Sequence, residues 1–404
     1  MESAKIIAVL ARMLRDVGRA EELAQDALVA ALERWPQDGV PDRPGAWLMT
    51  AARNRAFDEL RRGKLMLRTE LSLRAEAESA GEGAPPPEEL LDDEIGDDLL
   101  RLIFIACHPV LATQARVALT LRLLGGLTTD EIARAFLQSE ATIAQRIVRA
   151  KRTLAEAHVP FEIPRSGELA ARLASVLEVI YLVFNEGYAA TAGDDWTRPA
   201  LCEEALRLGR ILAELVPTSP EVHGLVALME LQASRLPARV APNGEPILLL
   251  EQARARWDQL LIRRGLAALE RAEALGGALG PYALQAAVAA CHARAHVAAE
   301  TDWVRIVALY DALAQLAPSP VVELNRAVAV SMAFGPAAAL EIVAQLASDG
   351  RLAGYHLLPS VHGDLLQKLG HRAEARAEFE RAATMTRNGR ERALLLERAA
   401  ACRD

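Results

Sequence analysis

The spacing of apolar residues constrains the fold of this chain more than any other feature. In nearly every long segment these residues recur at positions i, i+3, i+4 and i+7, and no stretch alternates apolar and polar residues with period two. Aromatic residues make up only 4% of the sequence, which also disfavours strands. The sequence therefore predicts an all-α protein. Its 404 residues, 51% of them hydrophobic, suffice for two or three domains of ordinary size.

Overall composition excludes several classes of protein. The net charge of −8 means that any nucleic-acid binding must rest on local basic patches. The four cysteines are scattered without a CxxC pair, which argues against a disulfide framework or a zinc ribbon. The first apolar run has six residues, and the later run 173–184 is interrupted by Glu178, so neither a signal peptide nor a membrane span is predicted. We expect a cytoplasmic protein.

Changes in composition divide the chain into segments. Residues 67–94 are predicted to form an acidic linker, because acidic residues dominate this stretch and three prolines follow one another at positions 85–87. The linker separates two helical modules, 1–66 and 95–158. Pro160 and Pro164 then mark a boundary before a long helical remainder, 165–404.

The remainder contains a repeat. Apolar or small residues recur at spacings of 34 and 35 residues in three columns: Ile306, Leu340 and Ala375; Tyr310, Ala344 and Phe379; Leu313, Ala347 and Ala382. In the last copy, Leu369 and Gly370 precede Ala375 and Phe379 in the tetratricopeptide pattern, in which a small residue lets two helices approach and an aromatic ring fills the gap. This predicts a helical-repeat solenoid over 300–402, and less firmly over 165–300.

A helix-turn-helix is predicted over residues 127–154. Thr128 and Glu131 have the spacing of a capping box, which begins a short helix. A turn over 137–140 follows, in which Ser139 can cap a second helix that turns Ile143, Ile147 and Leu154 inward. Basic residues cover the other faces of this second helix, as in a recognition helix for DNA. The alternative is a solvated helix in an ordinary bundle.

A second arginine-rich helix is predicted after Trp47. Its polar face presents Arg53, Asn54, Asp58, Arg61 and Arg62. Side chains of this kind beside an aromatic ring suit unstacked bases, whose edges accept hydrogen bonds and whose phosphates bind guanidinium groups. Alternatively, these arginines pair with Asp58 and Glu59 on their own helix.

The helix predicted over 20–35 is amphipathic. Leu23, Ala27, Ala31 and Trp35 share one face, with acidic residues around it. Such a helix can dock on helices of a partner protein, although it can equally belong to the core.

Taken together, these segments resemble a known family. AEELAQDALVAALERWP, PGAWLMTAARNRAFDELRR, the acidic linker and LTTDEIARAFLQSEATIAQRIVRAKRTL are similar, in this order, to the two conserved regions of bacterial extracytoplasmic-function (ECF) sigma factors of the sigma-70 family. The remainder, with VIYLVFNEGYAA and PSPVVELNRAVAV, resembles the tetratricopeptide-like extension of one subgroup. The resemblance covers nearly the whole chain.

The resemblance implies a role for each segment. The first module would be region 2, and its helix 20–35 would bind core RNA polymerase through Asp26, Ala27 and Ala30. The helix that follows would recognise the −10 element, with Asn54 and Asp58 at a flipped base. The full −10 set is Trp47, Arg53, Asn54, Asp58, Arg61 and Arg62. The second module would be region 4, which reads the −35 element through Thr142, Gln145, Arg146, Arg149, Lys151 and Arg152. The partners would be core polymerase, promoter DNA and a protein or peptide bound by the tail.

Three weaker signals do not point to chemistry. Cys291, His292 and His296 lie close enough to suggest a metal, but ordinary packing is the better interpretation. The stretch 185–187 is interpreted as a helix end. No phosphate-binding loop or nucleophile elbow is present in the sequence. We expect no enzyme activity, cofactor or metal.

Two other function classes compete with the sigma factor. One is a DNA-binding regulator with a helical sensor that acts without polymerase, and the other is an interaction scaffold. The helices at 20–35 and 47–62 favour the sigma factor, because a plain regulator needs only one helix-turn-helix. We further hypothesise that the tail replaces a separate anti-sigma protein.

Overall fold

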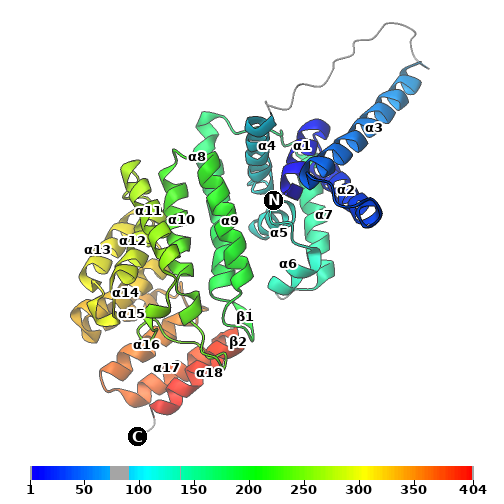
Figure 1. The fold of residues 1–404 in the computed structure, drawn as a ribbon. Helices are drawn as coiled ribbons and strands as arrows, with labels where there is room; N and C mark the ends of the chain where they lie inside the picture. Colours follow the sequence, from blue (N-terminus) through cyan, green and yellow to red (C-terminus); the bar gives the residue numbers. More distant parts are fainter. Residues whose placement is uncertain (1, 73–90, 137, 403–404) are drawn as a thin grey trace. The chain divides into compact units, whose positions relative to one another are not determined.

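The computed structural model describes residues 2–72, 91–136 and 138–402 (Figure 1). Within these ranges the chain forms eighteen α-helices and a single pair of two-residue strands, so the all-α prediction is confirmed. The chain divides into two compact units, Met1–Val179 and Ile180–Asp404.

Unit 1 contains the two predicted modules. Its helices are α1 (Glu2–Leu14), α2 (Val17–Asp38), α3 (Pro44–Ser72), α4 (Leu91–Ala106), α5 (Thr113–Leu123), α6 (Thr129–Ala135), α7 (Glu140–Glu156) and the first part of α8 (Ser166–Tyr188). Residues 6–11 of α1 are all buried, each at most 5% exposed. A helix covered on one face buries residues only every three or four positions, so α1 is enclosed on all sides. It packs against α2 and α3 of the first module and against α4 of the second.

Helices extend into both ends of the predicted linker. Helix α3 continues to Ser72 and α4 begins at Leu91, both inside the predicted linker 67–94. The central part of the linker, 73–90, lies outside the described residues. Acidic residues therefore do not by themselves mark the end of a helix here, since most of them have good helix propensity.

The predicted start of the tail at residue 165 does not coincide with the boundary between the two units, which lies after Val179. Helix α8 is continuous, and its residues up to Val179 belong to unit 1. Ser175 Oγ donates to the carbonyl of Cys107 at 2.7 Å, and Arg116 Nη1 donates to Ser175 Oγ at 2.5 Å and to Glu178 Oε2 at 3.0 Å. These partners lie on the two sides of the loop between α4 and α5, so α8 completes the core of the second module.

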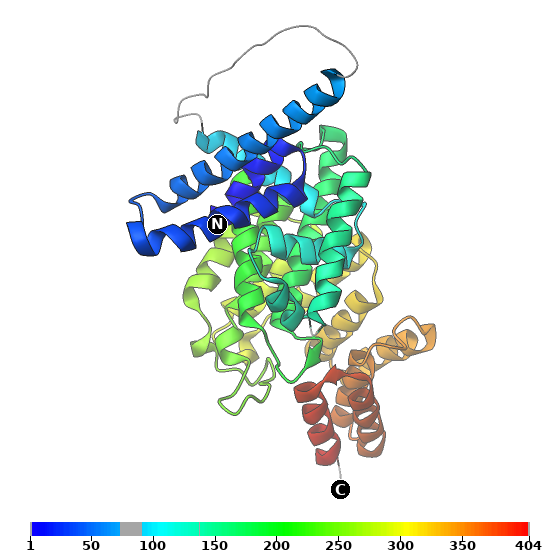
Figure 2. The same ribbon diagram turned by 90° about the vertical axis from the view of Figure 1, so that its right-hand side faces the viewer.

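Unit 2 contains the rest of α8 and the tail helices. These are α9 (Pro199–Leu215), α10 (Pro220–Ala233), α11 (Gln259–Ala274), α12 (Pro281–Arg294), α13 (Trp303–Leu316), α14 (Pro320–Phe334), α15 (Pro336–Asp349), α16 (Leu357–Lys368), α17 (Arg372–Met385) and α18 (Gly389–Ala401). From α9 onward each helix packs against the next one in sequence (Figures 1 and 2). This neighbour-to-neighbour packing is typical of helical repeats.

The predicted repeat columns have the wrong register in α15. Ala344 and Ala347 are exposed, whereas Ala339, Val343 and Leu346 are buried. The buried column is thus displaced by one residue from the predicted one. In the last repeat the predicted positions Ala375, Phe379 and Ala382 are all fully buried.

The two ends of unit 2 are joined. Strand β1 (Ala192–Gly193) pairs in parallel with β2 (Arg387–Asn388), which directly precedes α18. The buried Asn388 side chain donates from Nδ2 to the carbonyls of Ala190 and Asp195, at 3.0 and 2.8 Å. Its Oδ1 accepts from the amide of Glu391 and so caps α18. The tail is therefore closed by contacts between its first loop and its last helix, which an open solenoid lacks.

Candidate nucleic-acid and polymerase interface

The helix-turn-helix forms as the sequence predicts. The Thr128 amide donates to Glu131 Oε2 at 2.7 Å and the Glu131 amide donates to Thr128 Oγ1 at 3.2 Å, which completes the capping box of α6. Ser139 caps α7 by accepting from the amide of Thr142. Ile143, Ile147 and Leu154 are buried, so α7 is held by its apolar face while its polar face points outward.

Most residues assigned to −35 recognition lie on that outer face. Thr142, Gln145, Arg149 and Arg152 are exposed, and Arg146 is half-buried, with Nη2 donating to Gln138 Oε1 at 2.9 Å. Arg152 pairs with Glu156 on the same helix at 2.6 Å, and this hydrogen bond raises the pKa of Arg152. Both contacts are exposed and local, so either side chain can reorient toward DNA at small cost.

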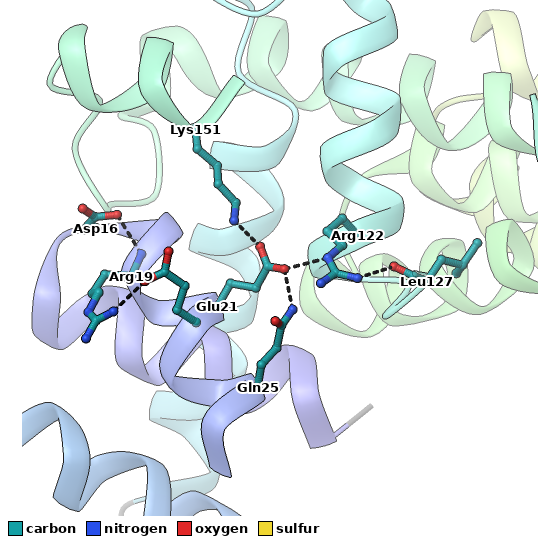
Figure 3. A network of polar contacts seen from close by, with 8 residues as sticks. Asp16, Arg19, Glu21, Gln25, Arg122, Leu127 and Lys151 are labelled. Atoms are coloured by element: carbon teal, nitrogen blue, oxygen red, sulfur yellow. Dashed lines mark hydrogen bonds and ion pairs between the residues drawn. The ribbon is translucent and has the colours of Figure 1, made fainter. Parts of the chain in front are cut away.

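Lys151 is placed differently from its neighbours on α7. Its Nζ lies 2.5 Å from Oε2 of Glu21, a residue of α2 in the first module (Figure 3). Arg122 of α5 approaches the other carboxylate oxygen, with Nε 2.6 Å from Oε1. The Glu21 side chain is only 6% exposed. Sequence reasoning missed Glu21, because a single acidic residue in an amphipathic helix carries no signal that it will be buried.

The residues expected to recognise the −10 element lie along α3. Asn54, Asp58 and Arg61 are exposed and Arg53 is half-buried, while the side chain of Arg62 lies outside the described residues. Trp47 packs edge-on against Trp35 of α2, with ring centroids 5.6 Å apart. This contact packs the start of α3 against α2.

An ion pair joins α3 to α2. Glu59 accepts from Nε of Arg19 on α2, at 2.7 and 2.9 Å from its two oxygens. Together with Glu22, this contact raises the pKa of Arg19. Glu59 therefore anchors α3 to α2.

The residues of α2 expected to bind polymerase are only partly accessible. Asp26 is exposed and Ala30 is half-buried, but Ala27 is fully buried. The predicted contact through Ala27 needs correction, because its methyl group packs inside the module and offers no surface to a partner. Sequence reasoning missed the exposed apolar residues beside it, Leu28, Val29 and Leu32, of which Leu32 is 75% exposed.

The histidine cluster and the stretch 185–187 have structural contacts. His292 is buried edge-on against Trp303, at 5.1 Å between ring centroids, and His296 lies beyond the end of α12. No group of residues suited to bind a metal occurs in the described ranges. Glu186 is near the end of α8, where it pairs with Arg198 and accepts from Thr191 Oγ1 at 2.9 Å. The prediction of a helix end at 185–187 is confirmed to within a residue.

Comparison with known proteins identifies the modules. The family model of sigma-70 region 2 matches residues 2–65, and that of sigma-70 region 4 matches residues 101–154. The chain is 30% identical over 147 residues to the ECF RNA polymerase sigma factor SigK of Mycobacterium sp. (strain KMS), which covers 35% of this chain and 72% of the relative. The chain belongs to the ECF sigma factor family. SigL of Mycobacterium tuberculosis is 28% identical over 144 residues, 35% of this sigma factor and 76% of the relative.

The tail of this sigma factor has relatives too. A family of unknown function, DUF6596, matches residues 172–273, from α8 to α11. An uncharacterized protein of Rhizobium meliloti (strain 1021) is 44% identical over 401 residues, 96% of this sigma factor and 90% of the relative. Its similarity therefore extends through both sigma regions and the tail. Among the described residues of the sigma factor, no helix is long and apolar enough to cross a membrane.

A sigma factor directs core RNA polymerase to promoters, and family membership thus supplies the general function and the partners, core polymerase and promoter DNA. In this sigma factor, region 2 corresponds to α1, α2 and most of α3, and region 4 runs from α4 to α7.

Proposed function

We propose that α7 reads the −35 element and α3 the −10 element of the promoter. The observation that supports this most directly is the polar face of α7, where Thr142, Gln145 and Arg149 are exposed on a helix fixed by its cap and its buried apolar face. The major groove admits such a helix, and each bidentate contact with a base contributes about 1–3 kcal/mol of discrimination.

The assignment of the −10 element rests on α3. Asn54 and Asp58 are exposed one helical turn apart, on the same helix as Trp47. Amide and carboxylate groups recognise base edges, and an aromatic ring stacks on an unpaired base. Arg53 and Arg61 would then bind phosphates of the melted strand.

For polymerase binding we propose the exposed strip of α2 formed by Asp26, Leu28, Val29 and Leu32. Three apolar side chains in contact with water on a single helix mark an interaction surface more strongly than scattered ones do. An amphipathic helix of this kind docks in a groove or on the helices of its partner. Ala30 lies at the margin of this strip.

We propose that unit 2 regulates the sigma modules or binds a protein or peptide partner. The support is the continuity of α8, whose first part is fastened to region 4 through Ser175 and whose second part enters the tail. The tetratricopeptide-like packing of the later helices would supply the partner surface. We also propose that the protein acts in the cytoplasm and has no enzyme activity of its own.

Reconstitution tests these proposals. Purified full-length protein is mixed with core RNA polymerase, and co-elution and run-off transcripts from the promoter of its own operon are measured. A stable complex with a defined start site is the expected result. Duplex binding without any association with polymerase would favour a DNA-binding regulator instead.

A chain that ends after Val179 shows what the tail contributes. This end point retains the part of α8 that packs on region 4, whereas an end at residue 165 would remove it. If the tail is regulatory, transcription by the shortened chain differs from that of the full chain. Unchanged activity and regulation would contradict this role.

A further inference from the structure

We propose that Glu21 locks region 2 against region 4 in the free protein, and that Lys151 exchanges the Glu21 carboxylate for a DNA phosphate when the promoter is bound. The first half of the proposal concerns the chain alone. The second half rests on the proposed function of α7.

The lock is a single carboxylate with partners from two directions (Figure 3). On the region 4 side, Lys151 Nζ and Arg122 Nε lie 2.5 and 2.6 Å from its two oxygens. On the region 2 side, Gln25 Nε2 donates to Oε1 at 2.8 Å. Arg122 is itself held by Leu127, whose carbonyl accepts from Nη1 at 3.1 Å. The cation partners therefore come from both α5 and α7.

Burial makes the loss of one partner from this contact costly. The side chains of Glu21, Lys151 and Arg122 are 6%, 20% and 21% exposed. Removing one member of a buried ion pair leaves a charge with neither water nor partner, which is far more costly than breaking an exposed pair. The adjacent residue Glu22 shows the contrast, since its side chain is 60% exposed and it pairs with Arg19 on its own helix.

A second buried carboxylate lies at the same seam. Asp98 of α4 is fully buried, and its Oδ2 lies 3.2 Å from Nε of Arg12 on α1. Asp98 also pairs with Arg101 of its own helix at 2.6 Å. Ion pairs from α1 and from α2 thus join the first module to the second.

The closed arrangement cannot persist at a promoter. The −35 and −10 elements are centred about 25 base pairs apart, roughly 85 Å at 3.4 Å per base pair. A 2.5 Å contact between Glu21 and Lys151 cannot span modules placed on both elements. Opening would release Lys151, a cation on the DNA-reading helix, and a phosphate can then replace the carboxylate as its partner.

A distance measurement on the full-length chain tests the lock without polymerase or DNA. Spin labels are attached at Leu32→Cys on α2 and Val148→Cys on α7, both highly exposed, while the four natural cysteines are buried. We expect one short distance in the parent, and in Glu21→Gln at least a ten-fold larger population at long distances. The matched control Glu22→Gln should keep the short distance. An unchanged distribution in Glu21→Gln would overturn the lock.

The opposite side of the lock provides a second variant, should Glu21→Gln fail to fold. Lys151→Met removes the cation and keeps the approximate length of the side chain. Arg152→Met is its control, because Arg152 pairs with Glu156 on its own helix. We expect the long-distance population in Lys151→Met and not in Arg152→Met. If neither changes the distances, the proposal is wrong.

Binding to a −35 duplex tests the exchange. With Lys151 released, Glu21→Gln should bind the duplex about five-fold or more tightly than Glu22→Gln, and its affinity should depend on salt more steeply by about one phosphate contact. If Glu21→Gln shows the long distances but does not bind the duplex more tightly, the contact between the modules is supported and the exchange of Lys151 to a phosphate is refuted. If Glu21→Gln shows the long distances but the parent chain supports no transcription with core polymerase, the proposed sigma function is contradicted instead.

Discussion

The carboxylate of Glu21 and the ammonium group of Lys151 lie 2.5 Å apart, one on α2 of region 2 and the other on α7 of region 4. This contact withdraws one of the basic residues of α7 from the solvent. Under the proposed role of α7, the availability of Lys151 to DNA depends on how the two modules are arranged.

Substitutions in region 2 and in region 4 should impair different steps, promoter opening and duplex binding respectively. Arg146→Ala should weaken binding to a −35 duplex by about ten-fold, since one contact is worth about 1–3 kcal/mol. Asn54→Ala should bind the same duplex normally but slow promoter opening, because the base it would contact is exposed only after melting. Duplex binding is measured by fluorescence anisotropy and opening by permanganate reactivity. Equal losses for both variants in both assays would contradict this division.

The first part of α8 should be required for the stability of region 4. A chain that ends after residue 165 lacks Ser175 and Glu178, the two side chains of α8 that accept hydrogen bonds from Arg116. Each buried polar group left without a partner costs about 1–3 kcal/mol. Thermal unfolding followed by circular dichroism should therefore give a lower Tm for this chain than for the chain that ends after Val179. Identical melting temperatures would mean that α8 adds nothing to this core.

The closure of unit 2 depends on one side-chain amide. Asn388→Asp keeps the oxygen that caps α18 but removes the Nδ2 donor to the carbonyls of Ala190 and Asp195. Because Asn388 is 1% exposed, the variant also buries a charge, and we expect the free energy of unfolding to fall by about 2 kcal/mol or more. Urea unfolding measures this change. Asn243→Asp is the control, since exposed Asn243 accepts from Glu245 in a turn, and an equal loss there would refute the role of the amide.

Unit 2 should lose stability in acid through His292. Burial, together with the nearby Arg235 and Arg254, lowers the pKa of His292 to about 3. Since the unfolded histidine titrates near 6.5, the unfolded state binds the additional proton between these values, so stability present above about pH 6.5 is lost as the pH falls. The slope contributed is at most about 1.4 kcal/mol per pH unit.

His292→Phe should flatten this dependence in urea unfolding between pH 4 and 7. The phenyl ring retains the aromatic contact with Trp303 but cannot bind a proton. His296→Phe, at an exposed position, serves as the control and should leave the slope unchanged. Parallel profiles for the parent and His292→Phe would exclude His292 as the source.

Local patterns determined much of this protein. Helix caps act over three residues, so Thr128, Glu131 and Ser139 could be assigned without knowledge of anything distant. The apolar faces of α2 and α7 likewise follow from helical periodicity alone. The order of these segments along the chain was sufficient to indicate both sigma regions, because each region is continuous in sequence.

In alanine-rich helices, local patterns did not predict which residues are buried. Around α15 nearly every face is small or apolar, so the sequence did not distinguish Ala344 from Val343 as the buried position. Packing against α14 and α16 decided the register. On α2, periodicity placed Ala27 on the apolar face, and the structure shows that this face packs inside the module.

Contacts between distant residues were decided by tertiary structure alone. Glu21 carries no local sign of burial, and its partners Arg122 and Lys151 reach it only because α5 and α7 fold back on α2. The sharing of α8 between two units and the joining of β1 to β2 are of the same kind. Periodicity reports which face of a helix is apolar, whereas the partner of a buried charge depends on which segments pack together, and that is determined by the whole fold.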